Sequence, residues 1–267
     1  GAGGGRAECL AVSSGRSARF SVEDATALYE GIRRATEHYR LDLVGGNTSA
    51  SLTGLLLSAT AIGTASDEEL ILRSGARDKE LLCVTGNLGA AYLGLQLLER
   101  EKRVLQGNGV SRPEINREHA YILQRQLKPE ARVDVLNQLR EAGIRPTAMI
   151  DVTRGLASAT LHLCQRSGVG ARIYLNRIPI ASETFRMAEE MHIDPVVAAL
   201  NGGDDFELLF TAPLDKHREL LTMAGVDVIG HIVPASAGAA LETPDGGEIR
   251  LQAPDWTARV TEAETAE

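Results

Sequence analysis

Apolar and polar positions follow two periods along the chain, and these predict helices and strands. Residues 22–38 carry apolar side chains at helical spacing, and a capping-box-like polar run opens the segment at Ser21. Residues 41–44 read as a short strand that ends at a Gly-Gly pair, and residues 54–63 read as a longer buried strand. The charged residues 65–70 are the best candidate for a linker.

Beyond that linker, strands and helices alternate. The predicted strands cover 81–85, 147–151, 169–175, 206–211 and 226–233. The predicted helices cover 130–142, 156–167, 182–191 and 214–223, in addition to one that begins near Gly89 and runs to Leu98. Asp245-Gly246 predicts a hairpin turn between two short strands. The pattern indicates an α/β or mixed α+β fold without internal repeats.

Composition and charge narrow the class of protein. The 267 residues are 43% hydrophobic and 24% charged, which is typical of a globular protein with a buried core. The formal net charge is −8 without a lysine or arginine cluster, which argues against nucleic-acid or membrane partners. No apolar run reaches the ~18 residues of a membrane-spanning helix. Cys9, Cys83 and Cys164 are odd in number and far apart, which indicates reduced thiols in a cytoplasmic compartment.

Four glycine-marked segments could carry chemistry. They are "VGGNTSAS" (44–51), "RSGAR" (73–77), "IDVTRGL" (150–156) and "LNGGDDFELLF" (200–210). Glycine turns expose backbone N–H groups that suit a phosphate, and a strand that turns through glycine into a helix is a common phosphate or metal site. Each segment also has an ordinary structural explanation, as a tight turn, a strand end or a solvated loop.

The acids in these segments suggest electrostatic catalysis. Asp204, Asp205 and Glu207 lie together at the start of an apolar strand, where their mutual repulsion would be relieved by a cation or a positively charged ligand. The six histidines show no paired spacing, and no nucleophile motif or P-loop occurs. Glycine turns, acids and arginines without acid–base machinery suit phosphoryl transfer, in which positioning and metal charge do most of the catalysis.

The order of these motifs resembles that of a known enzyme family. "LVGGNT", "RSGARDKELLCVTGNLGAA", "QLKPEAR", "AMIDVTRGL" and "LNGGDDFELLF" follow one another as in the thiamine-monophosphate kinases of the aminoimidazole ribonucleotide synthetase-like superfamily. The resemblance covers the chain from about residue 20 to residue 256. It implies ATP-dependent phosphorylation of thiamine monophosphate to the diphosphate, with Mg²⁺. It also implies a homodimer and two lobes, here a truncated N-terminal ATP-binding lobe over 1–66 and a C-terminal α/β domain over 67–267.

The resemblance further implies roles for individual residues. It places ATP contacts at Gly46, Asn47, Arg73 and Thr153, metal ligands at Asp151 and Asn47, and substrate contacts at Asp204 and Trp256. Three of these positions differ from the family pattern, which has Asp, Ser and Glu where this chain has Asn47, Thr153 and Asp204. Asn47 keeps an oxygen ligand but loses a charge, Thr153 keeps the hydroxyl, and Asp204 keeps the charge on a shorter side chain. The larger change is Arg154, which stands where the family has a second metal-binding acid. A guanidinium there could serve as a phosphate counter-charge in place of one Mg²⁺.

Three hypotheses remain from the sequence. The first is a thiamine-monophosphate kinase. The second is a catalytically inactive relative that binds nucleotide, thiamine phosphate or a partner protein. Asn47, Arg154 and the absence from residues 1–20 of the family's G-D-D-A, T-D and S-D motifs favour it, and indicate either a fragment or a member that has lost catalysis. The third is an aminoimidazole-ribonucleotide or selenophosphate-type synthetase of the same superfamily, against which "RSGAR" and "GGDDFELLF" argue.

Overall fold

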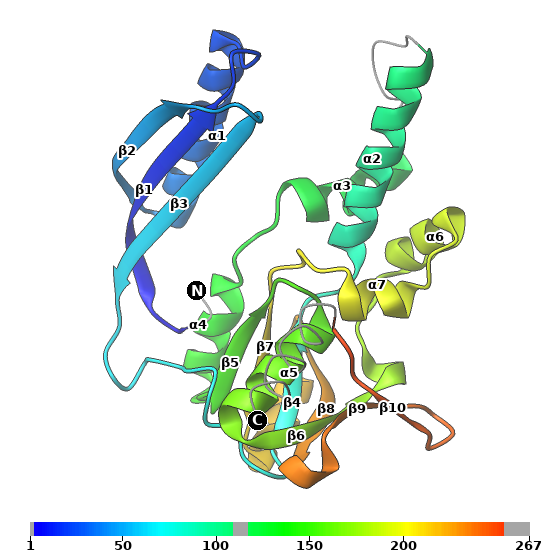
Figure 1. Cartoon of the computed structure of the whole chain (residues 1–267). Coiled ribbons are helices and arrows are strands. Elements are labelled where there is room, and N and C mark those ends of the chain that lie inside the picture. Colours follow the sequence, from blue (N-terminus) through cyan, green and yellow to red (C-terminus); the bar gives the residue numbers. More distant parts are fainter. Residues whose placement is uncertain (1–2, 109–116, 254–267) are drawn as a thin grey trace, which may run out of the picture. The chain divides into compact units, whose positions relative to one another are not determined.

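The computed structural model describes residues 3–108 and 117–253, which divide into two compact units (Figure 1). Unit 1 comprises residues 3–70, and unit 2 begins at Ile71. The division therefore falls a few residues after the boundary expected between residues 66 and 67. Within the described residues, no helix combines the length and the apolar character needed to cross a membrane.

Unit 1 is a small sheet with one long helix. The strands β1 (Arg6–Arg16), β2 (Asp42–Ala50) and β3 (Leu55–Thr64) lie in the order β2-β1-β3, and α1 (Val22–Tyr39) connects the first two. β1 pairs with β2 in parallel and with β3 antiparallel. The helix begins at a capping box, since the Ser21 hydroxyl accepts from the Asp24 N–H at 3.0 Å and the Asp24 carboxylate accepts from the Ser21 N–H at 3.2 Å.

Three features of unit 1 differ from the sequence predictions. β1 was not predicted at all. The expected turn at "VGGNTSAS" is wrong, because Gly46 and Asn47 lie inside β2, opposite Val12 and Ser13 of β1. A Cβ at Gly46 would overlap the Val12 carbonyl oxygen, so this glycine permits close strand pairing. The strand predicted as buried, β3, is exposed along its whole length.

Unit 2 is built on a seven-stranded sheet in the order β10-β9-β6-β8-β4-β7-β5. Its strands are β4 (Leu81–Thr85), β5 (Ala148–Val152), β6 (Val169–Tyr174), β7 (Glu207–Ala212), β8 (Val226–Pro234), β9 (Ala239–Glu242) and β10 (Glu248–Arg250). Only the β6–β9 pair is parallel among these described neighbours. Helices cover both faces, which explains why central strands such as "LLCVT" are almost continuously apolar.

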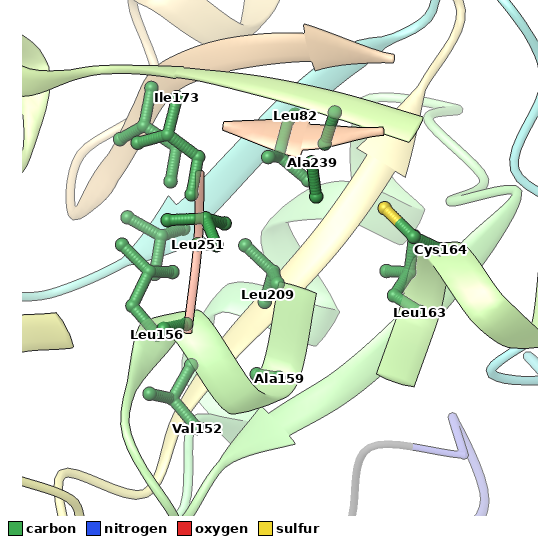
Figure 2. Close-up of a cluster of buried hydrophobic side chains, with 14 of the residues drawn as sticks. Leu82, Val152, Leu156, Ala159, Leu163, Cys164, Ile173, Leu209, Ala239 and Leu251 are labelled. Carbon is green, nitrogen blue, oxygen red and sulfur yellow. The ribbon is translucent and has the colours of Figure 1, made fainter. Parts of the chain in front are cut away.

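The helices of unit 2 form three groups. They are α2 (Ala90–Asn108), α3 (Ala120–Leu127), α4 (Val133–Glu141), α5 (Leu156–Ser167), α6 (Ser182–Met191), α7 (Pro195–Asn201) and α8 (His217–Leu221). α5 packs on one face of the sheet, where Leu156 and Leu163 meet Leu82, Val152 and Leu209 (Figure 2). α4 and α8 cover the other face, and α2, α3, α6 and α7 share a separate cluster of buried side chains.

Most elements of unit 2 confirm the periodicity of the sequence. β4, α5 and α6 have the predicted limits, and the hairpin between β9 and β10 turns at Asp245-Gly246 as expected. The helices α3 and α7 were not predicted. Both are short, and a helix of two turns carries too few apolar repeats to stand out in a sequence.

Candidate functional site

Three of the predicted site residues meet at the end of β5. Asp151 is the penultimate residue of that strand, and its Oδ1 lies 3.8 Å from the Arg73 guanidinium. The Thr153 hydroxyl donates a hydrogen bond to the other carboxylate oxygen of Asp151. The "RSGAR" loop and the "IDVTRGL" turn, which are far apart in the sequence, therefore form one partly exposed polar site. Arg154 is exposed on the same turn.

The turn that holds Asp204 lies against this site. β5 and β7 are antiparallel neighbours, so the chain leaving β5 lies beside the chain entering β7. The Asp204 N–H donates to the Thr153 carbonyl at 2.8 Å, and the Phe206 N–H donates to the Val152 carbonyl at 3.0 Å. Asp151, the expected metal ligand, and Asp204, the expected substrate contact, therefore come from β5 and from the turn that precedes β7, at the same end of the sheet.

Helix α5 begins at the same place. Its N-cap is Gly155, with φ of 87°, and no side chain caps the helix there. A Cβ at Gly155 would overlap the Leu200 carbonyl oxygen, so glycine is needed for the turn to pack against the end of α7. The N-terminus of a helix carries partial positive charge, which adds to that of the nearby arginines and favours an anion.

Asp205 and Glu207 do not face a ligand, as was expected of the acids in "GGDDFE", but are buried in the fold. Asp205 and Glu207 are only 2% and 1% exposed, so neither faces a ligand in solvent. Asp205 accepts hydrogen bonds from the N–H of Gly89 at 2.9 Å and of Ala91 at 3.5 Å, at the start of α2. The prediction that an external cation relieves this acidic cluster is wrong for Glu207, because the chain's own arginines neutralise it.

These arginines come from α3 and from the segment before α4. The Arg125 Nη2 lies 2.8 Å from Glu207 Oε1, and the Arg132 Nε lies 3.1 Å from Glu207 Oε2. The Thr85 hydroxyl donates to Glu207 Oε2 at 2.5 Å. We call Arg125, Arg132, Glu207 and Thr85 the buried bridge. Sequence reasoning missed it, although Arg132 closes the "QLKPEAR" motif and Thr85 opens "TGNLG".

Burial has a large effect on Asp205. The low polarity around this carboxyl raises its pKa from 3.8 to about 7. The N–H groups of Gly89 and Ala91 and the charge of Arg125 oppose this rise, and the charge of Glu207 adds to it. With a pKa of about 7, the Asp205 carboxyl therefore changes its protonation state near neutral pH in the folded chain.

The residues present fit only part of a Mg²⁺ site. Within the described part of the chain, no group of three or more His, Cys, Asp or Glu side chains is placed to hold a metal ion. Asp151 offers one carboxylate, which Arg73 already approaches. Mg²⁺ is often held by one or two carboxylates, water and substrate phosphates. The described residues of unit 2 therefore form no preformed metal cage.

The remaining predicted residues do not belong to the described residues of unit 2. Gly46 and Asn47 belong to β2 of unit 1, where the following Thr48 and Ser49 line a cavity of about 610 Å³ together with Arg16. Trp256 lies outside the described residues.

Comparison with known proteins identifies the family. Residues 88–241 match the family model for the C-terminal domain of AIR synthase related proteins. The thiamine-monophosphate kinase of Aquifex aeolicus is 31% identical over 225 residues, which cover 84% of this chain and 68% of that protein. The chain belongs to the thiamine-monophosphate kinase family. The Bacillus subtilis member is 31% identical over 217 residues, covering 81% of this chain and 62% of the relative.

Solved structures agree with this assignment. The Aquifex aeolicus enzyme superposes with a TM-score of 0.78 at 28% identity, and the alignment covers 93% of this chain and 77% of that one. A structure described as AaThiL complexed with AMPPCP and TMP gives the same TM-score at 30% identity, covering 93% of this chain and 73% of that one. The hydrogenase maturation protein HypE of E. coli shares the fold alone, with a TM-score of 0.74 at 19% identity.

This chain matches only part of the length of its relatives. It spans 68% of the Aquifex aeolicus kinase and 62% of the Bacillus subtilis kinase. Family membership and fold are therefore direct findings, whereas the activity of the whole protein is a matter for proposal.

Proposed function

We propose that this chain takes part in the reaction of its family, the transfer of the γ-phosphoryl group of ATP to thiamine monophosphate to give thiamine diphosphate. The observation that supports this most is the meeting of Arg73, Asp151 and Thr153 at one strand end, with the Asp204 turn hydrogen-bonded to it. Phosphoryl transfer needs cations, N–H and O–H donors and a carboxylate in one place, and little covalent chemistry from the protein.

Each residue would have a distinct role. Arg73 would hold nucleotide phosphate oxygens, aided by the Thr153 hydroxyl and the N-terminus of α5. Asp151 would hold a Mg²⁺ ion carried by the nucleotide, and that ion, when bound, offsets the negative charge of the phosphates. Asp204 would contact the thiamine phosphate. Gly46 and Asn47 would contact nucleotide phosphate from unit 1, Asn47 with a ligand oxygen for a metal, and Trp256 would pack on the substrate.

A second candidate is binding of the same ligands without transfer. Arg154 supports it, because the guanidinium at this turn brings a fixed positive charge where the family pattern has a metal-binding acid. A guanidinium neutralises a phosphate but cannot bridge two phosphates as a metal ion does.

A direct assay tests the proposal. The purified chain would be incubated with ATP, thiamine monophosphate and Mg²⁺, and the thiamine phosphates separated by chromatography. We expect thiamine diphosphate to form with the chain and to be lost with Asp151→Ala. If calorimetry shows both ligands binding while no diphosphate forms, the second candidate replaces the first. Binding of neither ligand would contradict both.

The same proposal includes a homodimer formed through unit 1. Its strands expose large apolar side chains, with Val44 60% exposed on β2 and Leu56 68% and Ile62 56% exposed on β3. Such a surface suits a second copy of the chain better than water. Light scattering on the wild type and on Leu56→Glu measures this directly. We expect a dimer that the substitution converts to a monomer, and a monomeric wild type would contradict this part of the proposal.

A further inference from the structure

The turn from Gly203 to Glu207 presents alternate side chains inward and outward. Asp205 and Glu207 are buried, whereas Phe206 is 40% exposed and Asp204 is partly exposed. The outward pair lies beside Thr153 and Val152, to whose carbonyls its N–H groups donate. One turn therefore carries both a pair that can meet a ligand and a pair that cannot.

The outward pair is held in an unfavourable backbone conformation. Asp204 has φ of 58° and Phe206 has φ of 53°. Side chains other than glycine rarely occupy this left-handed region, and such residues persist only when the surroundings enforce them. An aromatic residue, unlike Asp, gains no local hydrogen bond in that conformation. The enforcement must therefore come from neighbouring contacts.

Those contacts belong to the inward pair. Asp205 accepts from the Gly89 N–H, and Glu207 accepts from Thr85 and Arg125 and forms an ion pair with Arg132. The Arg125 Nη2 also donates to the carbonyls of Asn87 and Asp205, each at 3.2 Å. Arg125 is therefore hydrogen-bonded both to the turn and to the "TGNLG" segment.

We propose that Asp205 and Glu207 are positioning residues, which use Arg125, Arg132 and the "TGNLG" segment to hold Asp204 and Phe206 in their left-handed conformations at the ligand site. This assigns a role to the two motifs "TGNLG" and "QLKPEAR". The inference rests on the proposed function for its ligand, thiamine monophosphate. Its structural half concerns the turn alone and can be measured without any ligand.

Three variants of the full chain test it. Glu207→Gln removes the charge between the arginines at nearly constant volume, Asp205→Asn keeps an acceptor for the Gly89 N–H, and Arg125→Lys keeps the charge but loses the shared guanidinium contacts. Amide hydrogen exchange at Asp204 and Phe206 reports the turn. The amide of Ile232, which donates to the Glu80 carbonyl at 2.8 Å, serves as an internal reference.

The matched control is Glu80→Gln. Glu80 is the other buried glutamate among the described residues, 6% exposed, and it accepts from Arg77 and Thr147 rather than from the turn. We expect exchange at Asp204 and Phe206 to rise about tenfold or more in Glu207→Gln and Arg125→Lys relative to Ile232, and not in Glu80→Gln. Thiamine monophosphate affinity, measured by calorimetry, should fall about tenfold with Glu207→Gln and change less than about twofold with Glu80→Gln.

The two proposals fail in different ways. If the wild type does not bind thiamine monophosphate, the proposed function fails, and the exchange rates alone decide whether the inward pair positions the turn. If exchange at Asp204 and Phe206 is unchanged in all three folded variants, or rises only in proportion to that at Ile232, the positioning role is wrong. Normal ligand affinity in Glu207→Gln alongside accelerated exchange would also overturn it, because the held conformation would then be irrelevant to binding.

Discussion

The Arg125 guanidinium lies 2.8 Å from the carboxylate of Glu207, in a part of unit 2 where Glu207 is only 1% exposed. The Glu207 charge is removed from water, so it depends on the two arginines that neutralise it, Arg125 and Arg132. The residue at position 86 must also be small, because a Cβ on Gly86 would overlap the Glu207 carboxylate.

Gly86→Ala should therefore destabilise the fold through Glu207. Gly86 has φ of 59°, so alanine also adopts a strained backbone. The matched control is Gly143→Ala, since Gly143 has φ of 64° and a Cβ there would meet nothing within 4 Å. We expect the free energy of unfolding to fall by about 1 kcal/mol for Gly143→Ala and by about 3 kcal/mol for Gly86→Ala, measured by urea denaturation. An equal decrease in the free energy of unfolding for the two variants would contradict this, because the Glu207 side chain would then move aside without destabilising the fold.

Asp205 should make stability depend on pH. Burial raises its pKa to about 7 in the folded chain, against an ordinary value of 3.8. Between these two values the folded state holds a proton that the unfolded chain has lost, so the stabilisation is complete below about pH 4 and declines as the pH rises to 7.

The comparison with Asp205→Asn isolates this effect. The free energy of unfolding of the wild type relative to the variant should fall by about 1.4 kcal/mol for each pH unit between 4 and 7, and level off above pH 7. Asp245→Asn is the control, because a hydrogen bond from Thr243 lowers the pKa of Asp245 below its usual value. The difference in stability between the wild type and this variant should be constant above about pH 4 and should decline only as the pH falls below that value, a slope of the opposite sign. A flat difference for Asp205→Asn across pH 4–7 would contradict the prediction.

Arg73→Lys should weaken phosphate binding although it preserves the positive charge. A guanidinium can hold two phosphate oxygens at once, whereas an ammonium is a point charge on a flexible stem. We expect nucleotide affinity, measured by calorimetry, to fall by about tenfold, equivalent to about 1.4 kcal/mol. The control is Arg172→Lys, an arginine that pairs with Glu248 on β10. Equal affinity in the two variants would exclude Arg73 from the nucleotide site.

The cysteines should differ sharply in reactivity. Burial raises the pKa of both Cys83 and Cys164 to about 12, with the charge of Asp227 adding to the rise at Cys83. The thiolate is the reactive form, so these two thiols are protected at pH 8 by both charge state and burial. Cys9 is partly exposed in β1. We expect iodoacetamide to modify Cys9 alone in the native chain and all three thiols in urea, as read by mass spectrometry. Rapid native labelling of Cys83 would contradict this.

Local periodicity predicted most of unit 2, and tertiary pairing explains what it missed. Helix α5 and strand β4 carry their signal within their own residues, in apolar spacing and flanking glycines. The glycines at 45–46 look like a turn by intrinsic preference, but pairing with β1 draws them into a strand. β3 is apolar like a buried strand, and nothing within the sequence of unit 1 tells that its side chains stay exposed.

The candidate site divides in the same way. Asp151, Thr153 and Asp204 were predicted as site residues because motifs mark them, and the structure places Arg73 beside Asp151 and the Asp204 turn beside Thr153. The partners of Glu207 could not be identified, because Arg125 lies 82 residues from it and nothing local connects the two. Burial, which decides that Asp205 and Glu207 face inward and Asp204 outward, is a property of the packed fold and not of the motif.

The buried bridge also bears on how the chain folds. Its contacts close long stretches of chain, 82 residues between Arg125 and Glu207 and 122 between Thr85 and Glu207. The entropy of closing such loops is lost before their contacts form, so these contacts belong to the late part of folding. Substitutions in the bridge should leave the refolding rate nearly unchanged and accelerate unfolding, since their interactions are absent from the transition state. The ligand site would then be the last part of unit 2 to take shape and the first to be lost.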